Sequence, residues 1–210
     1  MRITKHPHAC VRLDDGDRHL LIDPGVWSDS AAALSDVDDI LITHEHVDHV
    51  DVEALTAYAA SRSSLRVHAP EPVAAMLGGL GDAVVTVAPG DTFVAGGFEV
   101  AVVGGLHAEI YDGLPGCANV GFVVDGSVYH PGDALHVPET PVATLLVPVS
   151  GPWLKLAEAI DFVRAVAPER AFPIHDALFS PAGIGLVDRW MGMKSETAYE
   201  RIADGSSVDV

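Results

Sequence analysis

Three histidines and two acidic residues lie within one short segment, Thr43–His49, which reads THEHVDH. In an extended or loop backbone, His44 and His46 project to the same side, so both side chains can reach one ion. Asp48 and His49 then turn toward an adjacent point as the chain enters the next helix. Neutral imidazole suits zinc, iron or manganese, and a carboxylate can bind the metal or orient its water. The segment therefore predicts a metal centre.

Three later residues are candidates to complete this centre. His107, Asp133 and His175 each lie at or just beyond the end of a strand-like segment. Binding residues are commonly held at such positions, on loops that a rigid scaffold carries. Either histidine alone would be interpreted as a hydrogen-bonded residue at a strand end. Their joint placement favours a shared role with the first segment.

Short strands are the main elements that must position these residues. An apolar strand over Asp39–Thr43 leads directly into the first segment, and Asp51 is the expected N-cap of a helix over Val52–Ala60. A helix is also expected over Pro72–Met76, and another from about Trp153 to Ala167, which Pro168 ends. Further strands are predicted at Ala9–Leu13, His19–Ile22, Leu65–His68, Ala83–Val87, Asn119–Val124, Ser127–His130, Thr144–Val147 and Ala171–Ile174, with two more in Thr92–Val103 joined at Gly96-Gly97. Many strands with a few helices indicate an α/β architecture of two sheets with helices outside them.

Composition indicates one globular domain. Of the 210 residues, 49% are hydrophobic and 20% charged, which suits a single domain over 1–203 followed by a flexible tail over 204–210. No apolar run approaches the roughly 20 residues that span a bilayer, and the first residues lack the apolar stretch of a secretory signal. Cys10 and Cys117 form no CxxC pair. We therefore expect two reduced thiols and a cytoplasmic protein.

The net charge of −18 restricts the class of partner. The twelve basic residues are scattered rather than clustered, so neither nucleic acid nor an anionic membrane surface is an expected partner. The acidic balance either favours solubility or helps to gather divalent cations. A small-molecule substrate is expected, and the sequence does not indicate whether the chain forms a homo-oligomer.

The ordered motifs resemble those of the metallo-β-lactamase superfamily. Thr43–His49 fits its THxHxDH signature, and Leu106-His107-Ala108, His130-Pro131-Gly132-Asp133 and Pro173-Ile174-His175-Asp176 follow in the family's order. A finer resemblance, over roughly residues 2–176, is to the branch of ascorbate-6-phosphate lactonase-like proteins. That branch's marks here are His8-Ala9-Cys10, Ile22-Asp23-Pro24-Gly25, Pro148-Val149-Ser150-Gly151 and Glu158-Ala159.

The resemblance implies a four-layer αββα sandwich, with two mixed sheets and helices on the outer faces. It further implies one or two divalent ions, with zinc expected first and manganese or iron as alternatives. The implied ligands of the first ion are His44, His46 and His107. Those of the second are Asp48, His49 and His175, and Asp133 would bridge both ions.

Other polar and aromatic residues receive weaker assignments. His8 is expected to orient a ligand, because ligands need hydrogen-bonding partners. Asp176 could hydrogen-bond a ligand histidine or serve a cap or turn, and Glu45 is not expected to bind metal. Core packing is the expected use of four aromatic or sulfur-containing residues that could instead line a pocket: Trp153, Phe179, Trp190 and Met191.

Hydrolysis is the predicted chemistry. A divalent ion lowers the pKa of bound water from near 16 to about 7, and Asp48 could orient this water and accept its proton. The expected substrate is a small lactone, ester or phosphodiester. A phosphorylated substrate would need a nearby lysine or arginine, and the only weak candidates in the sequence are Lys155, Arg189 and Lys194. A di-iron redox protein and a metal-binding module without catalysis are the alternatives.

Overall fold

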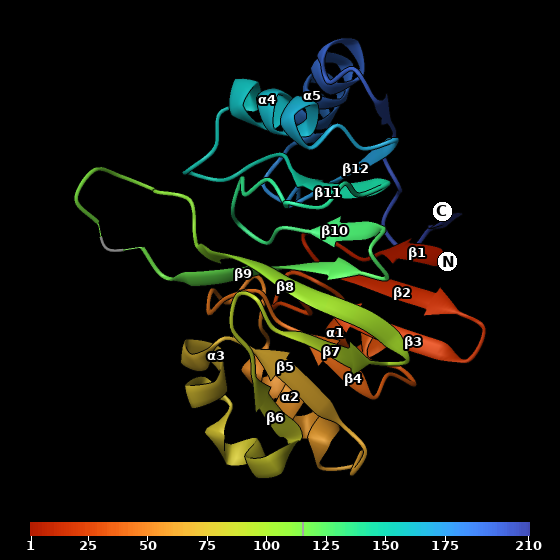
Figure 1. Ribbon diagram of the computed structural model, residues 1–210, viewed down its shortest axis with the longest axis vertical. Coiled ribbons are helices and arrows are strands. Elements are labelled where there is room, and N and C mark those ends of the chain that lie inside the picture. Colours follow the sequence, from red (N-terminus) through yellow and green to blue (C-terminus); the bar gives the residue numbers. More distant parts are fainter. Residues whose placement is uncertain (115) are drawn as a thin grey trace.

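Two seven-stranded sheets face each other in the computed structural model, which describes residues 1–114 and 116–210 (Figure 1). The first sheet has the order β14-β1-β2-β3-β4-β5-β6, and the second has the order β13-β12-β11-β10-β9-β8-β7. The strands of the first are β1 (Arg2–Lys5), β2 (Val11–Asp15), β3 (Arg18–Ile22), β4 (Asp39–Leu41), β5 (Arg66–Ala69), β6 (Val84–Thr86) and β14 (Ser207–Asp209). Those of the second are β7 (Thr92–Ala95), β8 (Phe98–Leu106), β9 (Ala118–Val124), β10 (Val128–His130), β11 (Thr144–Pro148), β12 (Arg170–Ile174) and β13 (Ala198–Tyr199). Both sheets are mixed: the antiparallel pair β2–β3 adjoins the parallel pair β3–β4 in the first, and the antiparallel pair β9–β10 adjoins the parallel pair β10–β11 in the second.

Helices cover the outer faces of the two sheets (Figure 1). On the side of the first sheet lie α1 (Ser30–Ala33), α2 (Val52–Ala59), α3 (Glu71–Met76) and the 3₁₀ helix η1 (Gly78–Ala83). On the side of the second lie α4 (Leu156–Val166) and α5 (Pro181–Lys194). Over the described residues, no helix is both long enough and apolar enough to cross a membrane.

Three clusters of buried side chains correspond to the three spaces between these layers. Leu20 and Phe122 belong to the cluster between the sheets. Leu55 belongs to the cluster between the first sheet and its helices, and Leu145 and Phe162 to the one between the second sheet and α4 and α5. Amphipathic helices and sheets are stable only when their apolar faces are covered in this way. The predicted four-layer αββα sandwich is confirmed.

Local sequence accounts for the helix that follows the first motif. The Asp51 carboxylate accepts a hydrogen bond from the Ala54 amide, as expected of an N-cap. The helix predicted from Trp153 begins later, at Leu156, because the Glu158 carboxylate accepts a hydrogen bond from the Lys155 amide and fixes the first turn there. It ends where Ala167 adopts a left-handed φ of 50° directly before proline.

The chain end differs from its prediction. The segment 204–210 was expected to be a flexible tail, but Ser207–Asp209 form the edge strand β14, paired antiparallel with β1. The Arg2 guanidinium and the Asp209 carboxylate add an ion pair across this edge. The expectation of a flexible tail is therefore wrong, because the terminal residues supply backbone hydrogen bonds to an otherwise open sheet edge.

Candidate metal centre

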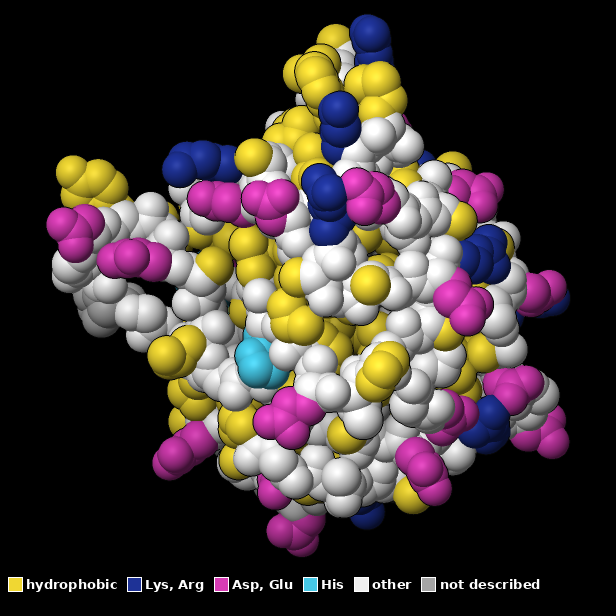
Figure 2. Space-filling model, turned by 45° about the horizontal axis from the view of Figure 1, so that its top comes forward, with side chains coloured by type: hydrophobic (Ala, Val, Ile, Leu, Met, Phe, Trp, Pro, Cys, Tyr) yellow, Lys and Arg dark blue, Asp and Glu magenta, His cyan; other side chains and the backbone are white. Residues whose placement is uncertain are grey.

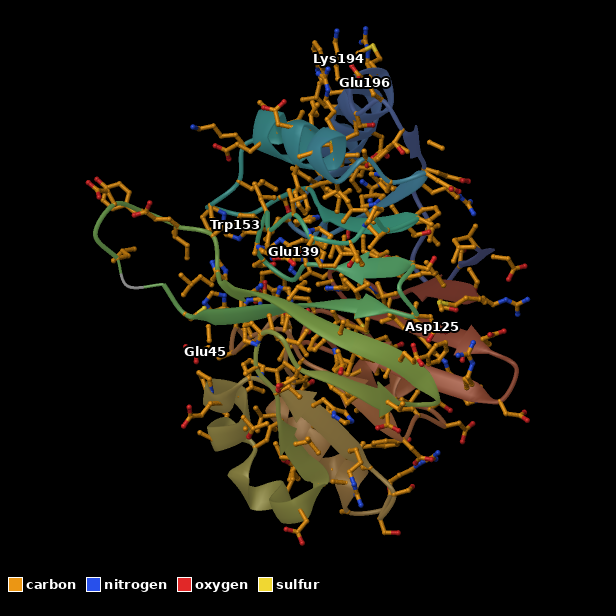
Figure 3. All side chains as sticks on the ribbon, in the orientation of Figure 1. Glu45, Asp125, Glu139, Trp153, Lys194 and Glu196 are labelled. Atoms are coloured by element: carbon orange, nitrogen blue, oxygen red, sulfur yellow. The ribbon has the colours of Figure 1, made fainter. Side chains whose placement is uncertain are left out.

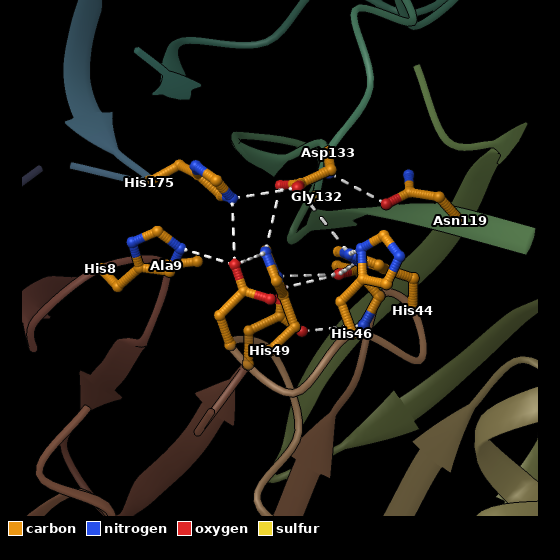
Figure 4. A network of polar contacts seen from close by, with 12 residues as sticks. His8, Ala9, His44, His46, His49, Asn119, Gly132, Asp133 and His175 are labelled. Carbon is orange, nitrogen blue, oxygen red and sulfur yellow. Dashed lines mark hydrogen bonds and ion pairs between the residues drawn. The ribbon is translucent and has the colours of Figure 1, made fainter. Parts of the chain in front are cut away.

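The candidate ligands lie on loops at one end of the facing sheets (Figure 4). The Thr43–His49 segment follows β4, and the other three candidates follow β8, β10 and β12. The two sheets meet here directly: His44 forms an isolated antiparallel bridge with Asn119 of β9. The loop after the first sheet is thereby fixed against the second sheet, which carries His107, Asp133 and His175.

One group of ligand atoms comes from His44, His46, His107 and Asp133, and these atoms lie within 4.8 Å of one another. His44 Nε2 is 3.0 Å from His46 Nδ1. Asp133 Oδ2 is 3.4 Å from His107 Nε2 and 3.8 Å from His44 Nε2. The three histidines that were predicted for the first ion therefore surround one point, with a carboxylate beside them.

A second group adjoins the first. Asp48 Oδ2 lies 3.4 Å from His175 Nε2 and 3.9 Å from His49 Nε2. Asp133 Oδ1 is 3.1 Å from His49 Nε2, and Asp133 Oδ2 is 3.0 Å from His175 Nε2. Asp133 thus contacts both groups, in the position that a bridging carboxylate would need. The structure brings all seven predicted ligands together.

Several of these inward-facing atoms fit a metal better than a hydrogen bond. The Nε2 atoms of His49, His107 and His175 and Oδ1 of Asp133 are buried and have no hydrogen-bond partner of suitable geometry among the described residues. Buried polar atoms without partners are rare and costly. A cluster of imidazole nitrogens and carboxylate oxygens is the donor set that suits zinc, iron or manganese.

Electrostatics favours the protonation state that a ligand requires at His44 and Asp133. Burial, together with the nearby His49, lowers the pKa of His44 well below its usual value, so its imidazole is neutral. Burial alone would raise the pKa of Asp133. The charge of His49 and the close His107 and His175 rings outweigh that effect and hold the pKa of Asp133 well below its usual range. Burial alone would lower the pKa of His49 and of His175, but the Asp133 carboxylate beside both rings raises each pKa above its usual value, so metal binding would release their protons.

Asp23 contacts a candidate ligand, although no role was predicted for it from the sequence. Its Oδ2 is 2.7 Å from His49 Nδ1 and accepts a hydrogen bond from Thr43 Oγ1 at 2.7 Å, while its Oδ1 accepts one from the Thr43 amide at 2.8 Å. Once His49 is neutral, as a ligand must be, this carboxylate would keep the proton on Nδ1 and leave Nε2 free to bind metal. The Ile22-Asp23-Pro24-Gly25 motif was the available signal, but an acidic residue before Pro-Gly is typical of a turn.

The loop that carries Asp133 is held by two further side chains. Asn119 Oδ1 accepts a hydrogen bond from the Asp133 amide at 2.9 Å. Trp153 Nε1 donates to Asp133 Oδ2 at 3.2 Å. Trp153 was expected to serve core packing; it is buried, but it also positions Asp133 and lines the cavity. Gly132 must be glycine, because it has a φ of +63° and an added Cβ would lie 2.4 Å from Asn119 Oδ1.

The two residues expected to orient ligands behave differently. His8 Nε2 lies 3.0 Å from Asp48 Oδ2 and so contacts a candidate ligand. The Asp176 carboxylate instead pairs with Lys5 Nζ at 3.1 Å and with the Arg201 guanidinium. A hydrogen bond from Asp176 to a ligand histidine is therefore not found, because two buried or half-buried cations hold its oxygens.

A cavity of about 560 Å³ opens over the candidate ligands His46, Asp48, His107, Asp133 and His175. Figure 2 shows hydrophobic side chains exposed among the charged ones on one face of the molecule, and Figure 3 places Trp153 and Glu45 on the same side of the molecule, at the left of the view. Glu45 is the remaining charged residue of the wall, and no lysine or arginine lines the cavity in the described part of the chain. The other wall residues are apolar: Trp27, Val47, Met76, Ile110, Pro152, Trp153 and Leu178.

Comparisons with known proteins agree with this geometry. A family model described as a beta-lactamase superfamily domain matches residues 2–175. The Mycobacterium tuberculosis protein Rv0786c is 35% identical over 99% of both chains. A UPF0173 metal-dependent hydrolase from Methanoregula boonei is 31% identical over 83% of this chain and 82% of its own.

Solved structures show the same fold. The metallo hydrolase Igni18 from Ignicoccus hospitalis has a TM-score of 0.76 and 20% identity, covering 99% of this chain and 97% of that one. The diiron beta-hydroxylase CmlA from Streptomyces venezuelae has a TM-score of 0.74 and 19% identity over all of this chain and 54% of its own. The family match and the paired His/Asp groups lead to one conclusion: the chain belongs to the metallo-β-lactamase superfamily and is a metal-dependent hydrolase.

Proposed function

We propose that the chain hydrolyses a small ester or lactone that carries an apolar substituent, at a centre of two divalent ions. The observation that carries this proposal is the wall of the cavity, which combines apolar side chains with an absence of lysine and arginine over the described residues. A phosphodiester or phosphorylated substrate would bring negative charge next to Asp48 and Asp133, with no lining cation to offset it. An uncharged carbonyl substrate avoids that repulsion.

We assign the residues to the two ions from the two groups of ligand atoms. His44, His46 and His107 would hold the first, and Asp48, His49 and His175 the second, with Asp133 shared. When bound, such ions lower the pKa of water toward about 7 and polarise a carbonyl oxygen. Zinc is proposed first because nitrogen ligands predominate, and manganese or iron would suit the same set.

Asp48 is the group we propose for proton transfer. It lines the cavity and its side chain is 14% exposed, so a substrate can approach it. Burial would raise the pKa of Asp48, but the close His175 ring and the hydrogen bond with His8 more than offset this and hold the pKa far below its usual range. The carboxylate is therefore ionised, which is the state in which it can accept a proton, and it lies on the cavity wall where a substrate would bind.

Two alternatives would give different measurements. A di-iron redox protein would use the same ligand types, and the likeness to a diiron hydroxylase supports the fold alone. Iron content with visible absorption would favour it over hydrolysis. A module that binds metal without catalysis would load ions and turn over none of the substrates tested. A module without catalysis would leave the apolar cavity directly above the ligands without a purpose.

Metal content is the first prediction. We expect unsupplemented protein to carry at least one tightly held transition-metal ion per chain in elemental analysis, with ligand atoms about 2.0–2.3 Å from a zinc-like ion. A chelator should abolish hydrolysis, and zinc, manganese or iron should restore it. Protein that takes up no transition metal under any loading condition would contradict the assignment of both groups.

Substrate preference is the second prediction. We expect kcat/KM to be higher for esters and lactones with an apolar acyl group than for matched short-chain ones, because each buried methylene contributes about 0.8 kcal/mol. Bis(4-nitrophenyl) phosphate should be a poor substrate. Met76→Ser, which makes one wall polar outside the ligand shell, should reduce the preference for the longer acyl chain. A higher rate with the phosphodiester than with any ester would overturn the proposed class.

We further propose a cytoplasmic location and a small-molecule substrate. Cys10 and Cys117 are both free thiols, which supports a reducing compartment.

A further inference from the structure

We propose that the His8 ring is a hydrogen-bond donor that positions Asp48 and His175 for the second ion, and that it is not itself a metal ligand. His8 invites the opposite interpretation, because its ring nitrogen lies within 4.8 Å of ligand atoms of Asp48, His49 and His175. The inference rests on the two-ion centre proposed above. It distinguishes Asp48, His49 and His175, which would bind the second ion, from His8, which would position them.

His8 is locked in place by its surroundings. It lies in the turn between β1 and β2, is 1% exposed, and has a left-handed φ of 66°. Its ring packs edge-on to Trp27 with 4.7 Å between centroids, and against His175 with 4.0 Å between centroids. Histidine is among the residue types that tolerate this backbone region best, yet the conformation persists only where the surroundings determine it.

The hydrogen bonds determine which ring nitrogen carries the proton. The Ala177 amide donates to His8 Nδ1 at 3.4 Å, so Nδ1 must be the unprotonated acceptor. In the neutral ring the proton is then on Nε2, which is 3.0 Å from Asp48 Oδ2. His8 therefore donates to the Asp48 carboxylate. A nitrogen that bears a proton offers no lone pair to a metal.

The backbone of the same residue holds the last motif. The His175 amide donates to the His8 carbonyl oxygen at 3.0 Å. Through ring and backbone together, His8 contacts Asp48 and His175, which belong to the second group of ligands (Figure 4). Removing only the ring should weaken the second ion and leave the first, which His44, His46 and His107 would hold.

His8→Phe tests this directly, since phenylalanine keeps the packing on Trp27 and His175 but cannot donate. In zinc titrations with a competing chelator, we expect the second ion to bind about 10–100-fold more weakly, the range for losing an orienting partner of a ligand. The first ion should bind as in the unmodified protein. His8→Gln retains a donor and should recover most of the second ion's affinity.

His68→Phe is the matched control. His68 is also a buried histidine, with Nε2 3.0 Å from Asp39 Oδ1 and its ring stacked on Phe93, but it lies on β5 outside both ligand groups. This variant should bind both ions normally. Circular dichroism of all three variants would show whether the fold is retained.

The tautomer gives a second, independent readout. Long-range ¹H–¹⁵N spectra of the zinc-loaded protein, with His8→Phe to identify the His8 signals, should show a neutral ring protonated at Nε2. A zinc-shifted Nε2, or a proton on Nδ1, would overturn the proposal, as would equal weakening by His8→Gln and His8→Phe. None of these measurements uses a substrate. A failure to hydrolyse esters would thus refute the proposed function without affecting this inference.

Discussion

Asp48→Asn should lower turnover by on the order of 10²–10⁴, the range for losing general acid–base assistance. The asparagine side chain has the same shape, so the hydrogen bond from His8 and the surrounding packing can persist. Its amide cannot accept a proton as the carboxylate does, and it is a poorer metal ligand. Steady-state kinetics on the best substrate of the panel, with metal content measured on the same samples, would test this.

Glu45→Gln provides the control, since it makes the same chemical change three positions earlier in the same loop. Glu45 belongs to neither ligand group, and we expect at most a mild loss of activity. Full activity in Asp48→Asn together with loss of activity in Glu45→Gln would mean that the two roles are reversed. Such a result would also remove the basis for the mechanism proposed here.

The metal ligands could be predicted from the sequence because residue type and position along the chain both indicate metal binding. Each follows a short apolar strand, and loops at one end of stacked sheets must come close together. The second layer of contacts could not be predicted in the same way. Asp23 is adjacent to a Pro-Gly turn in the sequence, and only the fold places it 2.7 Å from His49, 26 positions further along the chain. Trp153 reads as an ordinary core residue until its Nε1 is seen beside Asp133.

The elements that were not predicted are stabilised by contacts with distant parts of the chain rather than by local sequence. The helix α5 contains Gly183, Gly185 and Gly192, which disfavour helices, so packing of Val187 and Met191 stabilises it. Its start did carry a signal, because Ser180 caps the Gly183 amide. The strands β1 and β14 are short and pair the two ends of the chain, and no local pattern predicts contacts over such a separation. Strong local periodicity was predictive, and long-range pairing was not.

Asp23→Asn should destabilise the protein by about 3 kcal/mol, as expected when one member of a buried, hydrogen-bonded pair with charged character is lost. Asp23 receives hydrogen bonds from three groups, the Thr43 amide, Thr43 Oγ1 and His49 Nδ1. Asparagine keeps one acceptor oxygen, and its NH₂ group would face groups that are themselves donors. Urea denaturation of the metal-loaded protein would measure the loss in the free energy of unfolding.

Metal affinity should fall as well in Asp23→Asn, because Asp23 helps to orient ligands of both groups. It orients His49 directly, and through Thr43 Oγ1, which lies 2.9 Å from His44 Nδ1, it reaches a ligand of the first ion. We expect a loss of about 10–100-fold in affinity.

The control is Asp39→Asn, which alters the His68–Asp39 pair at a more exposed position, with the Asp39 side chain 22% exposed. That variant should change stability by less than about 1 kcal/mol and leave metal binding intact, because Asp39 is partly open to solvent, where such pairs contribute little, and it contacts no candidate ligand. Equal effects of the two substitutions on stability and on metal affinity would show that Asp23 has no particular role in orienting ligands.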